Sequence, residues 1–180
     1  MRALLAAAGL AVICVAAGCG SAGTPPGPAP SAQLTIGFGG YGPLRAGMTR
    51  AELLAATPVP LEQYGDAPGC AFLADARAAG RNPYGELQVT LDDRGRVLGI
   101  DPPSAARTDR GVAVGSSDEQ LRDAYADPAE QGTNESGRYL VYGSAAQGWL
   151  GFGLDEAGNV VEIRTGTKDF ASGFEVCSGE

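Results

Sequence analysis

The residues best suited to chemistry are four cysteines, Cys14, Cys19, Cys70 and Cys177, in a chain that contains no histidine. Thiolates act as nucleophiles, bind metals or form disulfides, and each use needs a particular spacing or partner. No two of the cysteines have the CxxC spacing of zinc sites and thioredoxin-type redox sites. The lack of histidine excludes Ser/His/Asp and Cys/His nucleophile systems. The cysteines therefore point to disulfide formation or covalent modification.

Acidic residues are the second reactive group. The chain of 180 residues has 21 acidic and 13 basic residues, a formal charge of -8, and no run of basic residues. This balance argues against a nucleic-acid partner. Carboxylates brought together in space could form the acid and base of an enzyme, but their spacing indicates no such pair. We expect neither enzymatic activity nor a cofactor.

Two acidic clusters, at 92–95 (DDRG) and 155–158 (DEAG), end in glycine. A calcium loop needs oxygen ligands at alternating positions over about a dozen residues, and neither cluster supplies them. An aspartate carboxylate can instead accept backbone N–H groups of a turn, and glycine tolerates a positive φ. We interpret both clusters as turns and predict no metal site.

The two turns lie in a stretch that occurs twice, as LQVTLDDRGRVLGI at 87–100 and as LGFGLDEAGNVVEI at 150–163. Apolar residues alternate with other residues on both sides of each turn, which predicts a β-hairpin with one buried face. The residues expected to face the core are Leu87, Val89, Leu91, Leu98 and Ile100 in the first hairpin, and Leu150, Phe152, Leu154, Val161 and Ile163 in the second.

A second pattern also occurs twice, at 44–53 and 112–121. Thr49 with Glu52, and Ser117 with Gln120, have the spacing of a capping box, which predicts that a helix begins at each site. Proline follows each helix and cannot continue it.

A further strand is expected between each helix and hairpin, at 70–73 and 139–142, while 59–69 and 126–137 are expected to be loops. The chain thus predicts a helix followed by three strands, twice. We place the first repeat at 34–104, and the second repeat with a C-terminal tail at 105–180.

The N-terminal region has the features of an export signal. Arg2 precedes an apolar run at 4–17 that is short for a membrane span. The sequence AAGC at 16–19 resembles the bacterial lipobox. The resemblance implies removal of a signal peptide at 1–18 and a lipid on Cys19, placing the protein on the extracytoplasmic face of the cell membrane. The alternative is an ordinary secretory signal followed by a nearby cysteine. Residues 19–33, rich in Pro, Gly and Ser, read as a tether.

Removal of Cys14 with the signal and modification of Cys19 would leave two thiols, Cys70 and Cys177. Exported proteins meet an oxidising environment, so we predict a disulfide between them. The alternative is two independent buried thiols.

The segment Gly47-Met48-Thr49, followed by Glu52-Leu53, a proline and an expected antiparallel sheet, is similar to two related groups. These are the SmpA/OmlA outer-membrane assembly lipoproteins and the β-lactamase-inhibitor-protein-like repeats. The tandem arrangement favours the second group. This resemblance implies an α+β fold of two tandem helix-plus-antiparallel-sheet repeats, and protein binding across a sheet face, without naming a partner.

The leading hypothesis is therefore a non-enzymatic protein-binding or envelope-scaffold module on a membrane anchor, and the alternative is a carrier for a small ligand or lipid. A deep apolar pocket would favour the carrier. Clustered carboxylates with raised pKa values would favour an enzyme, and a flat aromatic sheet face would favour protein binding.

The candidate binding face lies on the second repeat, on the side of the sheet opposite Leu150 and Phe152. Glycines in a strand often mark close approach by another chain, and Trp, Tyr and Arg often carry binding energy. The alternative has Trp149 covered by a loop or by the C-terminal tail, against Phe170 or Phe174. The residues of the predicted face are Trp149, Gly151, Gly153, Arg164, Tyr139 and Tyr142, of which only one tyrosine can join Trp149 because the two have opposite parities.

Overall fold

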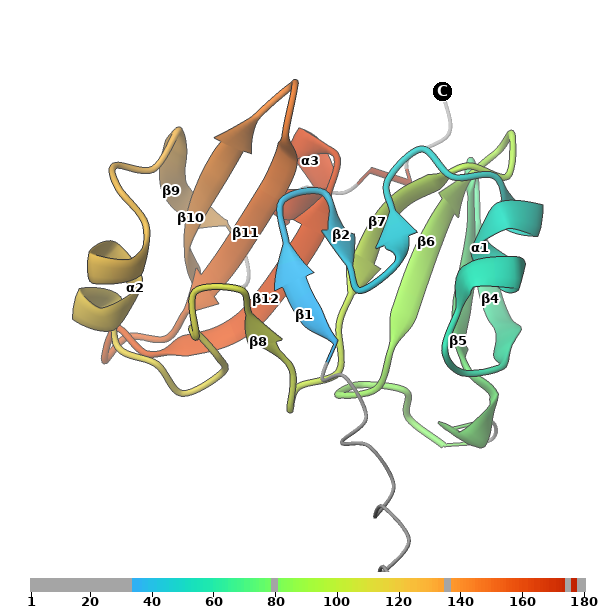
Figure 1. The fold of residues 1–180 in the computed structure, drawn as a ribbon, viewed down its shortest axis with the longest axis horizontal. Helices are drawn as coiled ribbons and strands as arrows, with labels where there is room; N and C mark the ends of the chain where they lie inside the picture. Colours follow the sequence, from blue (N-terminus) through green and yellow to red (C-terminus); the bar gives the residue numbers. More distant parts are fainter. Residues whose placement is uncertain (1–33, 79–80, 135–136, 174–175, 178–180) are drawn as a thin grey trace, which may run out of the picture. The chain divides into compact units, whose positions relative to one another are not determined.

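The computed structural model describes residues 34–78, 81–134, 137–173 and 176–177, all within one unit, Gln33–Glu180. The predicted signal peptide (1–18), the tether (19–33) and Cys19 lie outside the described residues. The fold is α+β and mostly β-sheet, with two sheets and a few short helices (Figure 1).

The larger sheet has eight antiparallel strands in the order β4-β5-β6-β7-β12-β11-β10-β9. Its strands are β4 (Leu61–Ala67), β5 (Cys70–Asp75), β6 (Gln88–Asp92), β7 (Val97–Asp101), β9 (Glu130–Asn134), β10 (Gly137–Ser144), β11 (Gly148–Leu154) and β12 (Val160–Gly166). Strands β4 to β7, from the first half of the chain, meet strands β9 to β12, from the second half, where β7 pairs with β12.

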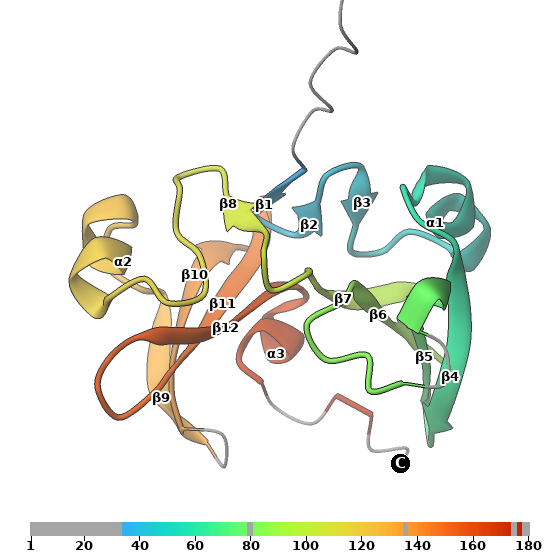
Figure 2. The same ribbon diagram turned by 90° about the horizontal axis from the view of Figure 1, so that it is seen from below.

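The smaller sheet has the order β3-β2-β1-β8, with β1 and β8 parallel. Its strands are β1 (Thr35–Gly37), β2 (Gly40–Tyr41), β3 (Leu44–Arg45) and β8 (Arg107–Thr108). Residue Ile36 of β1 is buried in the same core as the larger sheet, so the small sheet covers part of one face of the large one (Figures 1 and 2).

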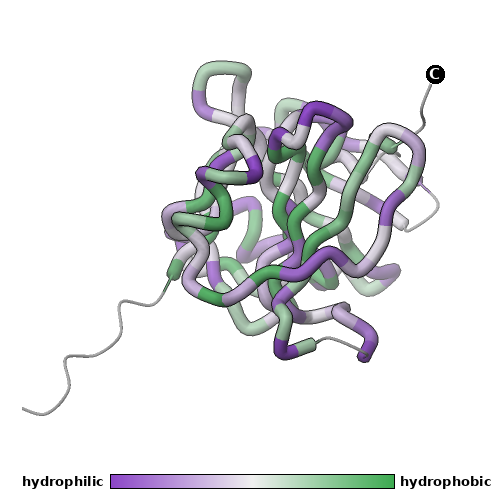
Figure 3. The backbone as a smooth tube through the Cα atoms, turned by 90° about the vertical axis from the view of Figure 1, so that its right-hand side faces the viewer, coloured by the Kyte–Doolittle hydropathy of each residue, from purple (hydrophilic) through white to green (hydrophobic). Residues whose placement is uncertain are grey.

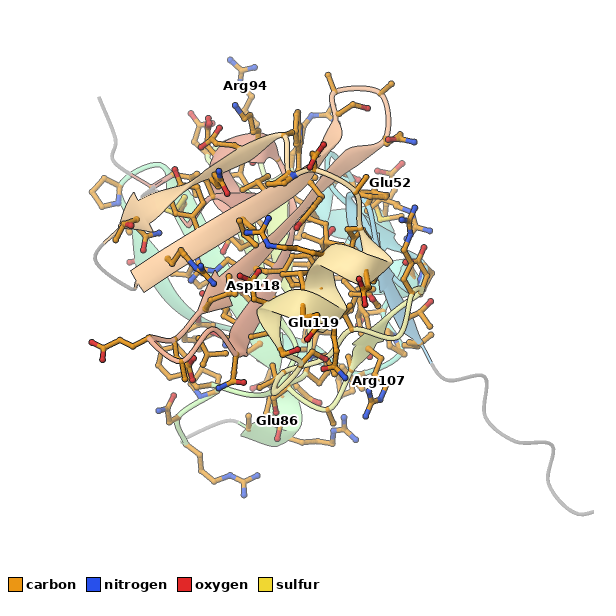
Figure 4. The ribbon with its side chains drawn as sticks, turned by 90° about the vertical axis from the view of Figure 1, so that its left-hand side faces the viewer. Glu52, Glu86, Arg94, Arg107, Asp118 and Glu119 are labelled. Atoms are coloured by element: carbon orange, nitrogen blue, oxygen red, sulfur yellow. A yellow bond between two sulfur atoms is a disulfide. The ribbon has the colours of Figure 1, made fainter. Side chains whose placement is uncertain are left out.

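The two predicted helices are α1 (Arg50–Ala56) and α2 (Asp118–Ala124), and both predicted capping boxes are present. Each helix buries one leucine completely, Leu53 or Leu121. Asp118, labelled on α2 in Figure 4, also forms an ion pair with Arg138 of β10 at 2.9 Å, which ties the helix to the sheet. A 3-10 turn, η1 (Ala76–Ala78), and a last short helix, α3 (Lys168–Ala171), complete the elements. Among the described residues, no helix combines the length and apolar character needed to cross a membrane.

The predicted hairpins β6–β7 and β11–β12 are present, with Leu87, Val89 and Leu91, and Leu150, Phe152 and Leu154, buried as expected. The turn residue Asp92 accepts the backbone N–H of Arg94 and Arg96, and Asp155 accepts that of Asn159, as predicted for turns. Figure 3 shows hydrophobic segments in the middle of the fold and hydrophilic residues on several of its outer loops.

The return strands differ from the prediction at Leu98 and Val161. The register shifts between Thr90 and Leu91, and again between Gly153 and Leu154, so that each return strand carries one extra residue. Such a β-bulge interrupts the alternation of period two. Val97 and Val160 therefore face the core, Leu98 is only half-buried, and Val161 is 49% exposed.

The predicted loops at 59–69 and 126–137 are also wrong, because they contain the strands β4 and β9. These strands form the two edges of the large sheet, and most of their side chains are exposed or half-buried. Polar edge strands lack the run of apolar residues by which strands are recognised in a sequence. The order is thus a helix followed by four strands in each half of the chain, rather than three.

Candidate functional site

A groove of about 1130 Å³ runs along the face of the large sheet that is turned away from α1 and α2. The sheet curves, so that the edge strands β4 and β9 both turn toward the side that holds α3 (Figure 2). The groove is lined from both halves of the sheet, including Phe72, Thr90, Gly153 and Arg164.

Helix α3 packs directly on the floor of this face. A Cβ at Gly151 would lie 1.8 Å from the carbonyl oxygen of Ala171, and a Cβ at Gly99 would lie 2.0 Å from the ring of Phe170. Glycine at these two positions therefore allows the helix to contact the strands. Beyond the helix, Cys177 lies at disulfide-bonding distance from Cys70 of β5, as predicted, with the Cα atoms 5.3 Å apart.

The substitution Gly151→Ala should destabilise the protein by about 1–3 kcal/mol, because the new methyl group must displace α3 from the sheet. Gly153→Ala is the matched control on the same strand. The new Cβ would lie 3.3 Å from the Cβ of Glu162, a contact that a small shift of this side chain relieves. We therefore expect this substitution to change the free energy of unfolding by less than about 1 kcal/mol. Urea unfolding of both variants measures the difference. Equal stability of Gly151→Ala and wild type would show that α3 does not pack as described.

The predicted binding face is partly covered by α3. Trp149 is half-buried and packs with Tyr139, Val141 and Ala171. Lys168 of α3 lies 5.7 Å from the centre of the Trp149 ring. The alternative interpretation, in which the C-terminal region covers Trp149, is therefore the right one, but the covering residues are Ala171 and Lys168. Phe170 lies instead over Gly99, and Phe174 lies outside the described residues. Trp149 and Gly151 are therefore not a free surface.

Tyr142 does not belong to this face. It stands opposite Leu150 in the register, whereas Tyr139 stands opposite Gly153, so the two tyrosines point to opposite sides of the sheet. Tyr142 is 4% exposed in the core, and its ring contacts Tyr125 at 5.3 Å and Phe152 at 5.8 Å between ring centres. Of the two tyrosines, Tyr139 joins Trp149, as one of them was expected to do.

At the middle of the groove, Arg164 lies between two carboxylates. Its Nη2 donates a hydrogen bond to Glu162 at 2.7 Å, and its Nε lies 3.5 Å from Asp101 Oδ1. Burial raises the pKa of Asp101 to about 6, against the opposing effect of Arg164, and Glu162 adds to the rise. The positions of β7 and β12 bring these three residues together, since the two strands are neighbours at the centre of the sheet.

Aromatic side chains form the wall of the groove contributed by the first half of the chain. Tyr64 is 51% exposed and Tyr84 is 81% exposed. The ring of Tyr64 contacts that of Phe72, with centres 6.1 Å apart, and its hydroxyl donates to Gln88 at 2.7 Å. Burial raises the pKa of Tyr64, and nearby Asp101 and Tyr84 add to the rise. Tyr64 is thus close enough to Asp101 for the carboxylate charge to affect its pKa.

Exposed apolar surface is concentrated in this groove. Five large hydrophobic side chains are exposed among the described residues, and four of them line the groove: Tyr64, Tyr84, Val114 and Val161. The fifth, Leu54, lies on α1. Apolar side chains gathered in this way mark interaction sites, whereas single ones are ordinary on a protein surface.

Comparisons of the chain with protein-family models, curated proteins and solved structures found no significant match. The site must therefore be judged by its own chemistry. It offers aromatic and aliphatic contacts, the guanidinium groups of Arg138 and Arg164, the carboxylates of Glu86, Asp101 and Glu162, and a raised pKa at Asp101. Its volume exceeds the roughly 300–1,000 Å³ of typical small-molecule pockets.

Sequence reasoning found only part of this site. Arg164, Gly151, Gly153 and Tyr139 were predicted and line the groove, but Asp101, Tyr64 and Tyr84 were missed. Asp101 directly follows the predicted hairpin, which ends at Ile100, and Tyr64 falls in the predicted loop at 59–69. The alternation that places Ile100 in the core also places Asp101 on the groove side, which is the one signal that could have found it.

Proposed function

We propose that the protein is an exported lipoprotein that binds another protein or acts as a scaffold in the cell envelope, through the groove and without catalysis. The observation that carries this proposal is that four of the five large hydrophobic side chains exposed in the described chain line the groove. Hydrophobic and aromatic side chains beside a few charged groups are typical of protein-binding surfaces.

We further propose that the two halves are tandem repeats like those of the β-lactamase-inhibitor-protein-like group. The support is internal. Each half has a capped seven-residue helix followed by four strands, and each hairpin has a bulge at the equivalent place, Leu98 or Val161. In that group the resemblance implies protein binding across a sheet face. It carries over no particular partner and no inhibitory activity.

The alternative, a carrier for a small ligand or lipid, has less support. A carrier needs an enclosed apolar cavity that covers most of its ligand. The groove instead lies along an open sheet face, and its centre holds the charged residues Asp101, Glu162 and Arg164. Isolated lipid chains would leave these charges without compensation.

The proposed anchor is a lipid on Cys19, at the end of the 19–33 tether, on the extracytoplasmic face of the cell membrane. Two or more acyl chains give stable attachment, whereas one gives only marginal binding. Partner binding would then take place within tether length of the membrane.

Site-specific photo-crosslinking in the native cell envelope tests the proposal. A photo-reactive amino acid at position 84 should yield a discrete crosslinked protein that mass spectrometry identifies. The matched control is the same amino acid at position 54, because Leu54 is also a large exposed hydrophobic residue but lies on α1.

Equal labelling from positions 84 and 54, or no product from either, would contradict the binding function. The same membrane fraction checks the anchor by intact mass, and a diacylglyceryl-modified Cys19 is expected. An unmodified Cys19 in a freely soluble mature protein would remove the anchor from the proposal.

A further inference from the structure

The charges that line the groove are unbalanced toward the negative. Glu86, Asp101 and Glu162 face two basic residues, Arg138 and Arg164. Arg138 is engaged by Asp118 of α2 at 2.9 Å. Among the described residues, Arg164 is the one basic residue that forms ion pairs with both Asp101 and Glu162. Two carboxylates therefore share one guanidinium, in a chain whose formal charge is already -8.

Both acidic side chains are partly exposed despite this contact, although Oδ1 of Asp101 is itself buried. The side chain of Glu162 is 40% exposed and that of Asp101 is 27% exposed. An incoming anion would meet an Arg164 already held by two carboxylates, and would add a third negative charge to the site. An incoming cation would instead reduce the repulsion between Asp101 and Glu162.

The aromatic wall favours the same ligand. Tyr64 and Tyr84 both line the groove, and the charge of Asp101 and the nearby Tyr84 each raise the pKa of Tyr64. Tyr84 also interacts electrostatically with Arg164 and contributes to the raised pKa of that guanidinium. The face of an aromatic ring attracts cations, and this attraction adds to that of a nearby carboxylate. A long side chain that ends in a charge satisfies both features, because its methylene groups pack on the rings while its head reaches the carboxylates.

We propose that the protein partner inserts a lysine or arginine side chain between the rings of Tyr64 and Tyr84 and the carboxylates of Asp101 and Glu162. This inference rests on the proposed binding function and specifies the chemistry of the partner. The inserted cation pairs with the carboxylates that Arg164 only partly neutralises, and the rings cover its aliphatic stem.

Binding of such a cation should depend on pH. Among the described residues, the charged or titratable groups that interact with Asp101 are Arg164 and Glu162 from β12 and Tyr64 from β4. Tyr84, in the loop before β6, interacts with Tyr64 and Arg164. Because the pKa of Asp101 is about 6, this carboxyl group is mostly ionised at pH 7.5 and mostly protonated at pH 5. The cation should bind more weakly at pH 5.

The test titrates the full mature chain, in detergent, with three blocked peptides of equal length: acetyl-Ala-Lys-Ala-amide, its norleucine analogue and its glutamate analogue. Ring resonances of Tyr64 and Tyr84 report binding by nuclear magnetic resonance. We expect the lysine peptide to shift both rings with saturation, and the norleucine and glutamate peptides to bind at least threefold more weakly. The change from pH 7.5 to pH 5 should weaken lysine-peptide binding about two- to fivefold.

Variants identify the carboxylates. Asp101→Asn and Glu162→Gln should each weaken lysine-peptide binding about two- to fivefold. Glu156→Gln is the control, because Glu156 is an exposed acid on the turn between β11 and β12 and does not line the groove. Binding that is unchanged in both groove variants, or equal for lysine and norleucine, would overturn the proposal. So would the lack of any ring shift with the lysine peptide.

The outcomes separate this inference from the binding function. Specific crosslinking from position 84 without a lysine response would retain protein binding and reject the inserted cation. A lysine response without crosslinking would show a cation site with no protein partner.

Discussion

Replacing Cys70 and Cys177 together by serine should lower the free energy of unfolding by about 4–5 kcal/mol. The bond joins residues that are 107 positions apart, so it removes much conformational freedom from the unfolded chain. In the folded chain it also attaches the segment after α3 to β5, on the other half of the sheet. We therefore expect the loss of stability to be accompanied by loosening of Val176 and residue 177 from the groove.

Guanidinium unfolding of the double variant, without reductant, measures this effect. Wild type with reductant is the control and should show the same loss, because it lacks the bond but keeps the cysteine side chains. Thiol titration of the denatured, non-reduced wild type should find neither Cys70 nor Cys177 free. Two free thiols, together with an unchanged unfolding midpoint in the double variant, would show that the bond does not form.

Asp101 should give the protein an unusual pH dependence, in which ionisation of a carboxyl group lowers stability. The pKa of Asp101 is about 6 in the folded chain, against 3.8 for an ordinary aspartate. Between these values the folded state binds the proton more tightly than the unfolded state does. The contribution of Asp101 to the free energy of unfolding is therefore greatest below pH 3.8, and it is lost as the pH rises through 6.

The size of this loss follows from the shift, because one pKa unit corresponds to about 1.4 kcal/mol and the shift of roughly two units to about 3 kcal/mol. The side chain of the Asp101→Asn variant cannot ionise, so this variant should not show the loss of stability between pH 3.8 and pH 6. The measurement is urea unfolding of both proteins from pH 4 to pH 8. The stability of wild type relative to Asp101→Asn should fall by about 2–3 kcal/mol over this range. A difference that stays constant with pH would contradict the raised pKa.

Local sequence predicted the helices and hairpins well because their signals are local. A capping box needs only residues three apart, and Thr49 and Ser117 begin their helices as expected. The alternation around Phe152 also holds over short distances. The bulged residues Leu98 and Val161 were misplaced because an extra residue in a strand depends on the pairing with its neighbour.

The groove was harder to predict because it depends on contacts between distant parts of the chain. Trp149 lies on the predicted side of the sheet, but only the position of α3 determines that this side is covered there. Asp101 and Arg164 meet because β7 pairs with β12. No pattern within either strand specifies that pairing. Gly151 carried a usable signal, since a strand glycine indicates close approach, but the approaching chain is the protein's own helix.

The Asp101–Arg164 contact has a consequence for the ancestry of the chain. Extending the two aligned hairpin sequences by one residue places Asp101 and Arg164 at equivalent positions. Under the proposed tandem-repeat origin, two identical ancestral copies would have carried the same residue at both positions. A charged residue there would have lain next to an identical charge where β7 pairs with β12. The residues present carry opposite charges, so the interaction is attractive, with Arg164 Nε 3.5 Å from Asp101 Oδ1. Under the same proposal, the two halves of the sheet have diverged at this pair of positions.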